Sequence, residues 1–213
     1  MKIALVGPTG FVGSKVLAEA LQRGHQVTAL ARNPSKLAAH AGLTVVQGDA
    51  TDVEQLARAV AGHDAVVSAY NAPRGTDDFR DRYLQGFQTV VEGVKRSGVK
   101  RLVMVGGAGS LFVAPGVQLC DTPQFPAEYR TEALAARDAL KQITEERGLD
   151  WTFVSPAPLL QPGPRTGRFR LGGDQVLMDG DKPGRISVDD LAVAIVDELE
   201  SPRHVQRRFT LAY

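Results

Sequence analysis

The chain is poor in cysteine, in net charge and in long apolar runs. Its 213 residues include a single cysteine, Cys120, and carry a formal net charge of +1 at pH 7. One cysteine cannot form an internal disulfide, which favours a reducing compartment, so we expect a cytoplasmic protein. The small net charge gives no electrostatic reason to expect nucleic acid or an anionic membrane as a partner.

Signals for membrane insertion, export and metal binding are also missing. No stretch approaches the roughly 18 consecutive apolar residues of a transmembrane helix. The run 1–6 has the length of a strand and lacks the apolar region and cleavage site of a signal peptide, so we expect none. No metal site is predicted, because the four histidines are scattered without ligand spacing: His25, His40, His63 and His204.

The residues that are present describe one α/β domain spanning 1–213. Hydrophobic residues make up 43% of the chain, which is enough for a sizeable core. Short apolar segments alternate with amphipathic helical segments, which predicts a doubly wound parallel sheet with helices on both faces. The predicted strands are 1–6, 26–30, 43–47, 64–69, 101–105, 151–154 and 208–212, and the predicted helices are 12–23, 52–61, 76–97, 127–147 and 187–199. We also expect a long loop over 106–126 and a hairpin over 168–178 around Gly172-Gly173.

A glycine-rich turn follows the first predicted strand directly. Gly7, Gly10 and Gly13 form the pattern G-x-x-G-x-x-G at the start of a helix. Gly7 permits a tight turn, Gly10 lets a pyrophosphate approach the backbone, and Gly13 lets the helix pack closely on its strand. Free amides at the helix start, from a turn that also holds Thr9, Phe11 and Val12, would hold the anion. The alternative is a tight turn without a ligand.

The end of the second predicted strand bears on the choice between NAD and NADP. An Asp or Glu there would accept from the ribose 2′-OH of NAD, but this chain has Arg32, followed by Lys36. A guanidinium can instead bind a 2′-phosphate, so we favour NADP(H), although both cations could simply be solvated. Asp49, after the third strand, could accept from the adenine amino group or cap the helix that follows.

The carboxyl ends of the remaining strands complete the predicted cofactor site. In a doubly wound sheet, ligands bind in the crevice outside these ends. The further cofactor-binding candidates are Ala50, Ala69, Tyr70, Asn71, Gly106, Gly107, Pro156 and Ala157.

Together these segments resemble a known family, the small atypical short-chain dehydrogenase/reductases of the NmrA-like, NAD(P)H-binding group. That group includes proteins described as NADH-flavin reductases, and biliverdin-IXβ reductase/flavin reductase is a more distant relative. The resemblance implies a Rossmann fold with short C-terminal substrate-side elements, and NAD(P)H chemistry in the cytoplasm. It rests on the segments 7–13, 31–36, 48–52, 105–111, 151–157, 185–192 and 208–210.

The chain departs from the pattern of the carbonyl-reducing members of that superfamily. Those enzymes carry Tyr-x-x-x-Lys, in which the Tyr donates a proton and the Lys lowers its pKa. Here Tyr129 is followed four residues later by Ala133. A tyrosine without an adjacent cation has a pKa near 10 and is a poor acid at pH 7. Ser110 follows the fifth strand, where the resemblance implies an active-site serine; otherwise it is a turn residue.

Hydride transfer to a flavin or quinone requires less of the protein, because water can supply the proton. We therefore expect an NADPH-dependent reductase, monomeric or homodimeric, that uses a dissociable flavin or quinone. The alternatives are a non-catalytic NADP(H) sensor and an atypical epimerase or dehydratase. Cys120 is more simply a packed thiol than a catalytic one. A basic cluster in the expected hairpin region could steer an acidic substrate or form a solvated strand face: Arg165, Arg168 and Arg170.

Overall fold

The computed structural model describes residues 1–213 and is built around one eight-stranded sheet. Its strand order is β10-β14-β8-β5-β4-β1-β2-β3. Seven strands are parallel, and only β10 runs antiparallel, against β14. The sheet is therefore doubly wound from β1, as the sequence predicts. Its strands are β1 (Lys2–Val6), β2 (Gln26–Ala31), β3 (Leu43–Gln47), β4 (Ala65–Ser68), β5 (Arg101–Val105), β8 (Asp150–Pro156), β10 (Arg170–Gly172) and β14 (Arg207–Ala212).

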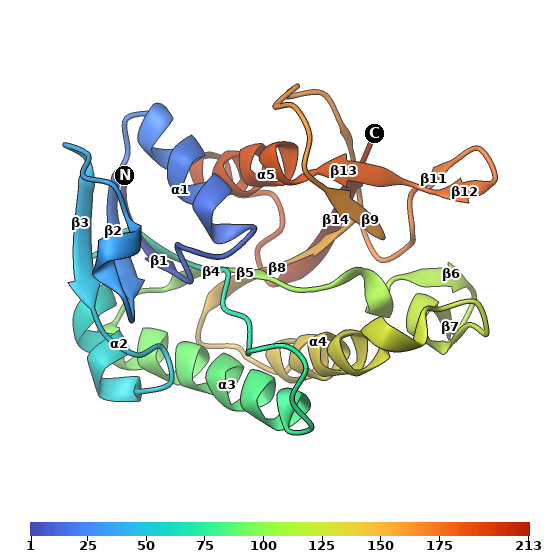
Figure 1. The fold of residues 1–213 in the computed structure, drawn as a ribbon, viewed down its shortest axis with the longest axis horizontal. Coiled ribbons are helices and arrows are strands. Elements are labelled where there is room, and N and C mark those ends of the chain that lie inside the picture. Colours follow the sequence, from blue (N-terminus) through green and yellow to red (C-terminus); the bar gives the residue numbers. More distant parts are fainter.

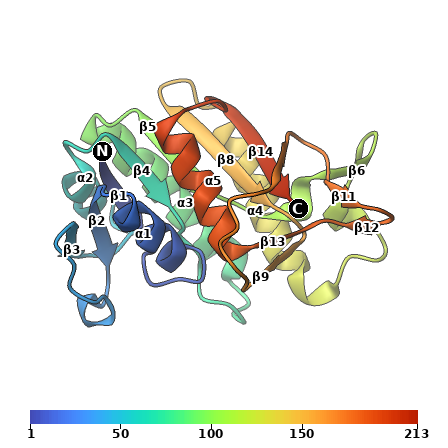
Figure 2. The same cartoon turned by 90° about the horizontal axis from the view of Figure 1, so that it is seen from above.

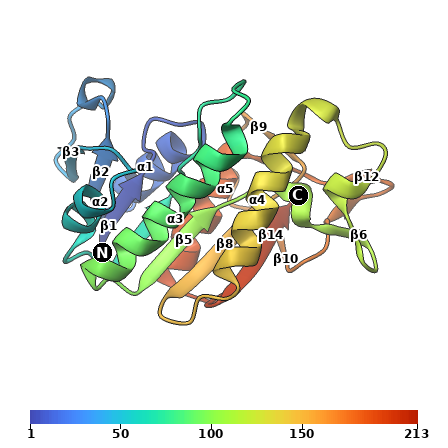
Figure 3. The ribbon, with the colours of Figure 1, turned by 90° about the horizontal axis from the view of Figure 1, so that it is seen from below.

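Helices cover both faces of the sheet (Figure 1). One layer consists of α1 (Gly13–Gln22) and α5 (Val188–Glu200), which lie side by side (Figure 2). The opposite layer consists of α2 (Val53–Val60), α3 (Phe79–Ser97) and α4 (Arg130–Ile143), which lie side by side in that order (Figure 3). None of these helices is long and apolar enough to cross a bilayer.

The central strands are apolar on both sides because both of their faces are covered. In β4, Val66 packs into the core beneath α2, α3 and α4, while Ala65 and Val67 pack into the core beneath α1 and α5. All four residues of β4 are buried. This burial explains the continuous apolar run that marks the strand in the sequence.

Local capping sets several helix boundaries as expected. The Ser187 side chain accepts from the Asp190 amide at 3.0 Å and begins α5. Asp52 accepts from the Gln55 amide at 3.0 Å and begins α2. At the other end of α3, Gly98 has φ +81°, the left-handed conformation typical of a helix stop.

The segment 168–178 does not form the predicted hairpin. Instead, β10 joins the edge of the main sheet, where Leu171 pairs with Leu211 of β14. The hairpin lies further along the chain, between β11 (Met178–Asp179) and β12 (Lys182–Pro183). The prediction was wrong because β10 forms its backbone hydrogen bonds with β14, which is far away in the sequence, and not with the residues that follow it.

The predicted loop 106–126 contains short ordered elements. These are η2 (Ala108–Ser110), the hairpin of β6 (Phe112–Ala114) and β7 (Val117–Gln118), and η3 (Leu119–Asp121). The hairpin turns at Gly116, whose φ is +74°. The next predicted helix, 127–147, begins with the single turn η4 (Ala127–Tyr129) before α4.

Two further short segments follow β8 in the chain and lie outside the main sheet. They are β9 (Leu159–Gln161) and β13 (Arg185–Ser187), which pair in parallel. The 3₁₀ turn η1 (Pro34–Lys36) follows β2.

Candidate functional site

The turn between β1 and α1 requires glycine at its first and third glycine positions. Gly7 has φ +78°, and a Cβ there would lie 2.6 Å from the Ala69 carbonyl oxygen. A Cβ at Gly13 would lie 1.9 Å from the Gly7 carbonyl oxygen. Gly13 therefore lets the helix approach the turn itself rather than the strand, which corrects the sequence interpretation. Gly10 has room, since a Cβ there would have only the Gly7 oxygen nearby, at 3.5 Å.

Several backbone amides of this turn are available to a ligand. The Gly10 amide donates to the Gly7 carbonyl, and the Ser14 amide donates to the Gly10 carbonyl. The amides of Phe11, Val12 and Gly13 donate to no acceptor in the protein, and no side chain caps α1. Amides at a helix start that lack a protein acceptor are suited to hold an anion. The Thr9 side chain and the Phe11 ring are both exposed beside them.

Arg32 and Lys36 lie at the end of β2 and in η1. Both side chains are exposed, and neither forms an ion pair or a side-chain hydrogen bond within the protein. Asn33 fixes the turn between them by accepting from the Ser35 amide at 3.2 Å. Two cations without a counter-ion therefore lie close in sequence after the second strand.

Arg32, Asp49 and Tyr70 are neighbours although they follow three different strands. Burial raises the pKa of the Tyr70 phenol, the Asp49 charge raises it further, and the Arg32 charge opposes the shift. Asp49 does not cap α2, because Asp52 does. Its Oδ1 instead accepts from the amide and hydroxyl of Thr51, at 2.9 and 2.8 Å, which leaves Oδ2 without a protein donor.

The segment 69–71 follows β4 at the carboxyl edge of the sheet, and its Tyr70 side chain turns away toward α3. The Tyr70 ring lies against Gly86 of α3, and its hydroxyl donates to the Arg82 carbonyl at 3.2 Å. The Ala69 amide donates to the Val6 carbonyl, while Asn71 is exposed. The Tyr70 side chain is therefore committed to α3, and Ala50 also packs beside the core on that face of the sheet.

Beyond β5 and β8, the predicted cofactor residues are tightly packed. A Cβ at Gly106 would lie 2.0 Å from the Phe153 ring, and one at Gly107 would lie 3.4 Å from the Ala136 Cβ. Pro156 and Ala157 are buried. Packing against Phe153 is by itself a sufficient reason for a glycine at 106.

The two predicted catalytic residues lie in different environments. Ser110 is 1% exposed, and its hydroxyl accepts from Arg208 Nη1 at 2.9 Å. Tyr129 is 51% exposed, and its hydroxyl has no partner in the protein. Ala133 is buried against Gly109, so no cation takes the place of the missing lysine. The site therefore lacks a tyrosine–lysine acid.

Cys120 and the predicted basic cluster have structural partners. Cys120 is buried, and burial raises the pKa of its thiol, which also contacts Arg137 Nη1 at 3.6 Å. Arg165 pairs with Glu19 of α1, and Arg170 donates to the carbonyls of residues 178 and 213. Two of the three arginines thus hold segments together and do not form one free patch. No cluster of His, Cys, Asp or Glu side chains could hold a metal ion.

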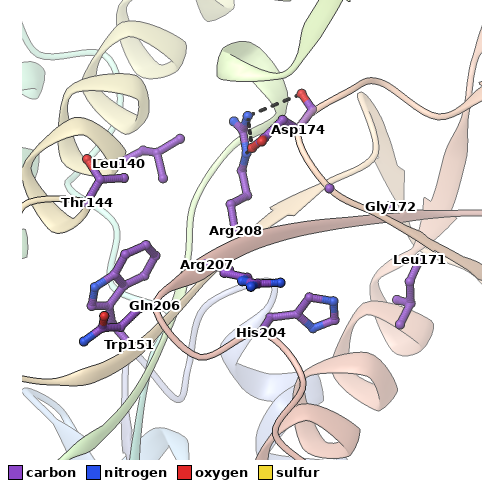
Figure 4. Close-up of a pocket in the computed structure, with 11 residues that line it drawn as sticks. Leu140, Thr144, Trp151, Leu171, Gly172, Asp174, His204, Gln206, Arg207 and Arg208 are labelled. Carbon is purple, nitrogen blue, oxygen red and sulfur yellow. Dashed lines mark hydrogen bonds and ion pairs between the residues drawn. The ribbon is translucent and has the colours of Figure 1, made fainter.

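A groove of about 600 Å³ lies between the carboxyl-terminal half of α4 and the β14–β10 edge (Figure 4). Its wall includes Arg208, which pairs with Asp174 on the segment after β10 (Figure 4). The sequence interpretation assigned neither residue to a site, because Asp174 fell in the predicted hairpin 168–178 and Arg208 in the predicted strand 208–212. The groove is lined by Leu140, Thr144, Trp151, Leu171, Gly172, Gly173, Asp174, His204, Gln206, Arg207 and Arg208.

Comparison with known proteins agrees on the family and the fold of this chain. A family model described as NAD(P)H-binding matches residues 7–202. A candidate exported protein of Burkholderia pseudomallei is 46% identical, with a TM-score of 0.90 and full coverage of both chains. A candidate epimerase of Bacteroides thetaiotaomicron is 42% identical, with a TM-score of 0.92 over 100% of this chain and 96% of that one. A candidate NADH-flavin reductase of Streptococcus pneumoniae is 33% identical, with a TM-score of 0.88 over 100% and 99% of the two chains.

Proposed function

Because the chain belongs to the NAD(P)H-binding family, we propose that it is an NADPH-dependent reductase that passes hydride to a dissociable flavin or quinone. The free amides of Phe11, Val12 and Gly13 would bind the pyrophosphate at the start of α1. The exposed guanidinium of Arg32, assisted by Lys36, would bind the 2′-phosphate. Asp49 Oδ2 would accept from the adenine amino group.

The observation that carries the choice of acceptor is the buried Ala133. A carbonyl acceptor needs an acid positioned at its oxygen, and Ala133 stands where the carbonyl-reducing enzymes carry the lysine that serves their tyrosine. A flavin or quinone ring takes the hydride into a conjugated system, and its proton can come from water. This difference supports a flavin or quinone over a ketone or a sugar nucleotide.

The residues of the chain would then act mainly by binding and orientation. Bound NADPH would supply the hydride, which is a proton with two electrons, and would leave as NADP⁺. Ser110, at the carboxyl end of β5, would contact the nicotinamide or the acceptor. The second proton on the reduced acceptor comes from solvent, so the reaction balances without a proton from the protein.

The missing acid is equally compatible with a non-catalytic NADP(H) sensor that regulates another protein. It argues against an epimerase or dehydratase, whose chemistry needs proton transfer by a protein group, although one similar structure is described as a candidate epimerase. Location in the cytoplasm and a monomeric or dimeric state stay predictions, and a similar structure is described as a candidate exported protein.

The test is NADPH oxidation by the purified protein with FMN, riboflavin, quinones and biliverdin as separate acceptors. We expect turnover with a free flavin or a quinone, and a colourless protein as purified, because the single glycine turn is assigned to the nicotinamide nucleotide. Tight NADPH binding without turnover on any acceptor would replace the reductase by the sensor. A yellow preparation with stoichiometric FMN would contradict the assignment of flavin as a dissociable substrate.

A further inference from the structure

We propose that Arg208 is a positioning residue that holds the Ser110 hydroxyl as a hydrogen-bond donor toward the ligand. This inference rests on the proposed function, because it assigns Ser110 to the hydride-transfer site. The two residues are 98 positions apart, on the last strand of the sheet and on the turn after β5. Their side chains meet on the side of the sheet that α4 covers. The sequence alone gives no sign of this contact.

The guanidinium of Arg208 contacts two residues, Ser110 on one side and Asp174 on the other. Nη1 donates to the Ser110 carbonyl at 3.0 Å and to the Ser110 hydroxyl at 2.9 Å. Nε donates to Asp174 Oδ1 at 2.9 Å, and Nη2 donates to the Asp174 carbonyl at 3.3 Å and forms an ion pair with Oδ1 at 2.7 Å. The guanidinium thus makes four hydrogen bonds to two residues on opposite sides, which fixes its orientation.

This arrangement determines what the Ser110 hydroxyl can do. An arginine can only donate hydrogen bonds, so the Ser110 oxygen is the acceptor and its hydrogen points elsewhere. That hydrogen has no acceptor in the protein. Ser110 follows β5, and the carboxyl ends of the parallel strands meet at the edge that also carries the Gly7–Gly13 turn. Ser110 is 1% exposed, so a ligand oxygen or nitrogen at this edge would have to pack directly against the turn to accept from this oriented hydroxyl.

The segment that carries Asp174 strengthens the hold on the turn. The Phe112 amide donates to the Asp174 carbonyl at 2.8 Å, and the Val176 amide donates to the Phe112 carbonyl at 2.9 Å. The Asp174 side chain is 69% exposed while that of Arg208 is 5% exposed, so the charge of Arg208 is balanced by a carboxylate that remains hydrated. The C-terminal elements thus hold residues 110–112 from two directions.

A purely structural role for Arg208 makes a different prediction. If Arg208 only stabilised the turn, its removal would lower stability and activity whether or not Ser110 carries a hydroxyl. If it acts through the hydroxyl, its removal should matter only when the hydroxyl is present. The two cases are separated by a double-mutant cycle.

The cycle compares wild type, Ser110→Ala, Arg208→Met and the double variant, by kcat/KM for the flavin or quinone that wild type uses. Each single variant should lose about tenfold or more, as expected for a charge-assisted hydrogen bond. The double variant should lose no more than Ser110→Ala alone. Arg58→Met is the control for loss of an arginine, because Arg58 of α2 is exposed, lies outside the groove and forms no ion pair or side-chain hydrogen bond; it should behave as wild type.

Independent losses that multiply in the double variant would overturn the inference. If Arg208→Met does not fold, the same cycle is run with Arg208→Lys, which keeps a charge near Asp174 but cannot span both sets of acceptors. If wild type shows no turnover, the proposed function has failed. The cycle is then measured on the NADPH dissociation constant, where an absence of coupling between the two residues would overturn the inference by itself.

Discussion

Ala133 and Gly109 lie so close that position 109 cannot carry even a Cβ without a shift. A Cβ built on Gly109 would lie 2.5 Å from the Ala133 Cβ, and Ala133 is only 8% exposed. The close contact joins the first turns of α4 to η2, which carries Ser110 at its end. The alanine that replaces the family lysine is therefore part of the packing between α4 and η2.

Tyr129→Phe should keep kcat within about tenfold of wild type. A general acid usually contributes about 10²- to 10⁴-fold, and the lysine that would partner Tyr129 is replaced by the buried Ala133. The measurement is steady-state NADPH oxidation with the preferred flavin or quinone. A larger loss with unchanged NADPH affinity would make Tyr129 a catalytic acid despite Ala133, and would bring back carbonyl reduction as the reaction.

Gly10→Val and Gly13→Val should separate ligand binding from folding. A Cβ at Gly10 meets little of the protein, so we expect the variant to fold by circular dichroism but to lose detectable NADPH binding. At Gly13 the Cβ would lie 1.9 Å from the Gly7 oxygen, so we expect a loss of at least about 1–3 kcal/mol in the free energy of unfolding. Tight NADPH binding by a folded Gly10→Val protein would mean that this turn is not the phosphate site.

Asp190 should make the protein less stable in acid. Burial alone would raise the pKa of this carboxyl, but hydrogen bonds from Thr166, the Gly167 amide and Tyr213 lower it below the ordinary value. A lowered pKa means that the carboxylate stabilises the fold above an ordinary pKa near 3.9, and that this contribution is lost as the pH falls through the folded-state value.

The matched test of this prediction is Asp190→Asn, measured by urea unfolding at several pH values. The asparagine cannot accept at both of its side-chain positions, so we expect the variant to be about 1–3 kcal/mol less stable than wild type at pH 7. The difference should shrink below pH 4, as the wild-type carboxyl becomes protonated. A difference that stays constant down to pH 2.5 would show that the carboxylate charge contributes nothing.

The sequence predicts the elements of this fold that form through local patterns. Apolar runs bounded by glycines give the strands of the parallel sheet, and Ser187 marks the start of α5 because its side chain caps the helix only three residues away. The G-x-x-G-x-x-G turn is equally local, since the conformation of Gly7 is set by the turn that it begins.

Contacts between distant segments are what the sequence does not reveal. The strand β10 pairs with β14, about 40 residues away, so its three residues look like one arm of a local hairpin. Arg208 lies in an apolar strand pattern that gives no sign of Ser110, and Asp174 falls within the segment predicted as a hairpin. Such partners are chosen by the topology of the sheet, which is known only once the order of its strands is known.

Arg32→Ala tests the assignment of the 2′-phosphate and hence the cofactor. A charge-assisted hydrogen bond contributes about 1.5–3 kcal/mol, so NADPH should bind about 10- to 150-fold more weakly. NADH lacks the 2′-phosphate, so its affinity should change little. Arg207→Ala serves as the control for a lost surface charge, because Arg207 is also exposed and unpaired but begins β14. Both dissociation constants are measured by fluorescence titration at one fixed salt concentration, since ionic strength screens exposed charges. Equal losses for NADPH and NADH would place Arg32 near a part that both dinucleotides share, and the preference for NADPH would then need another source.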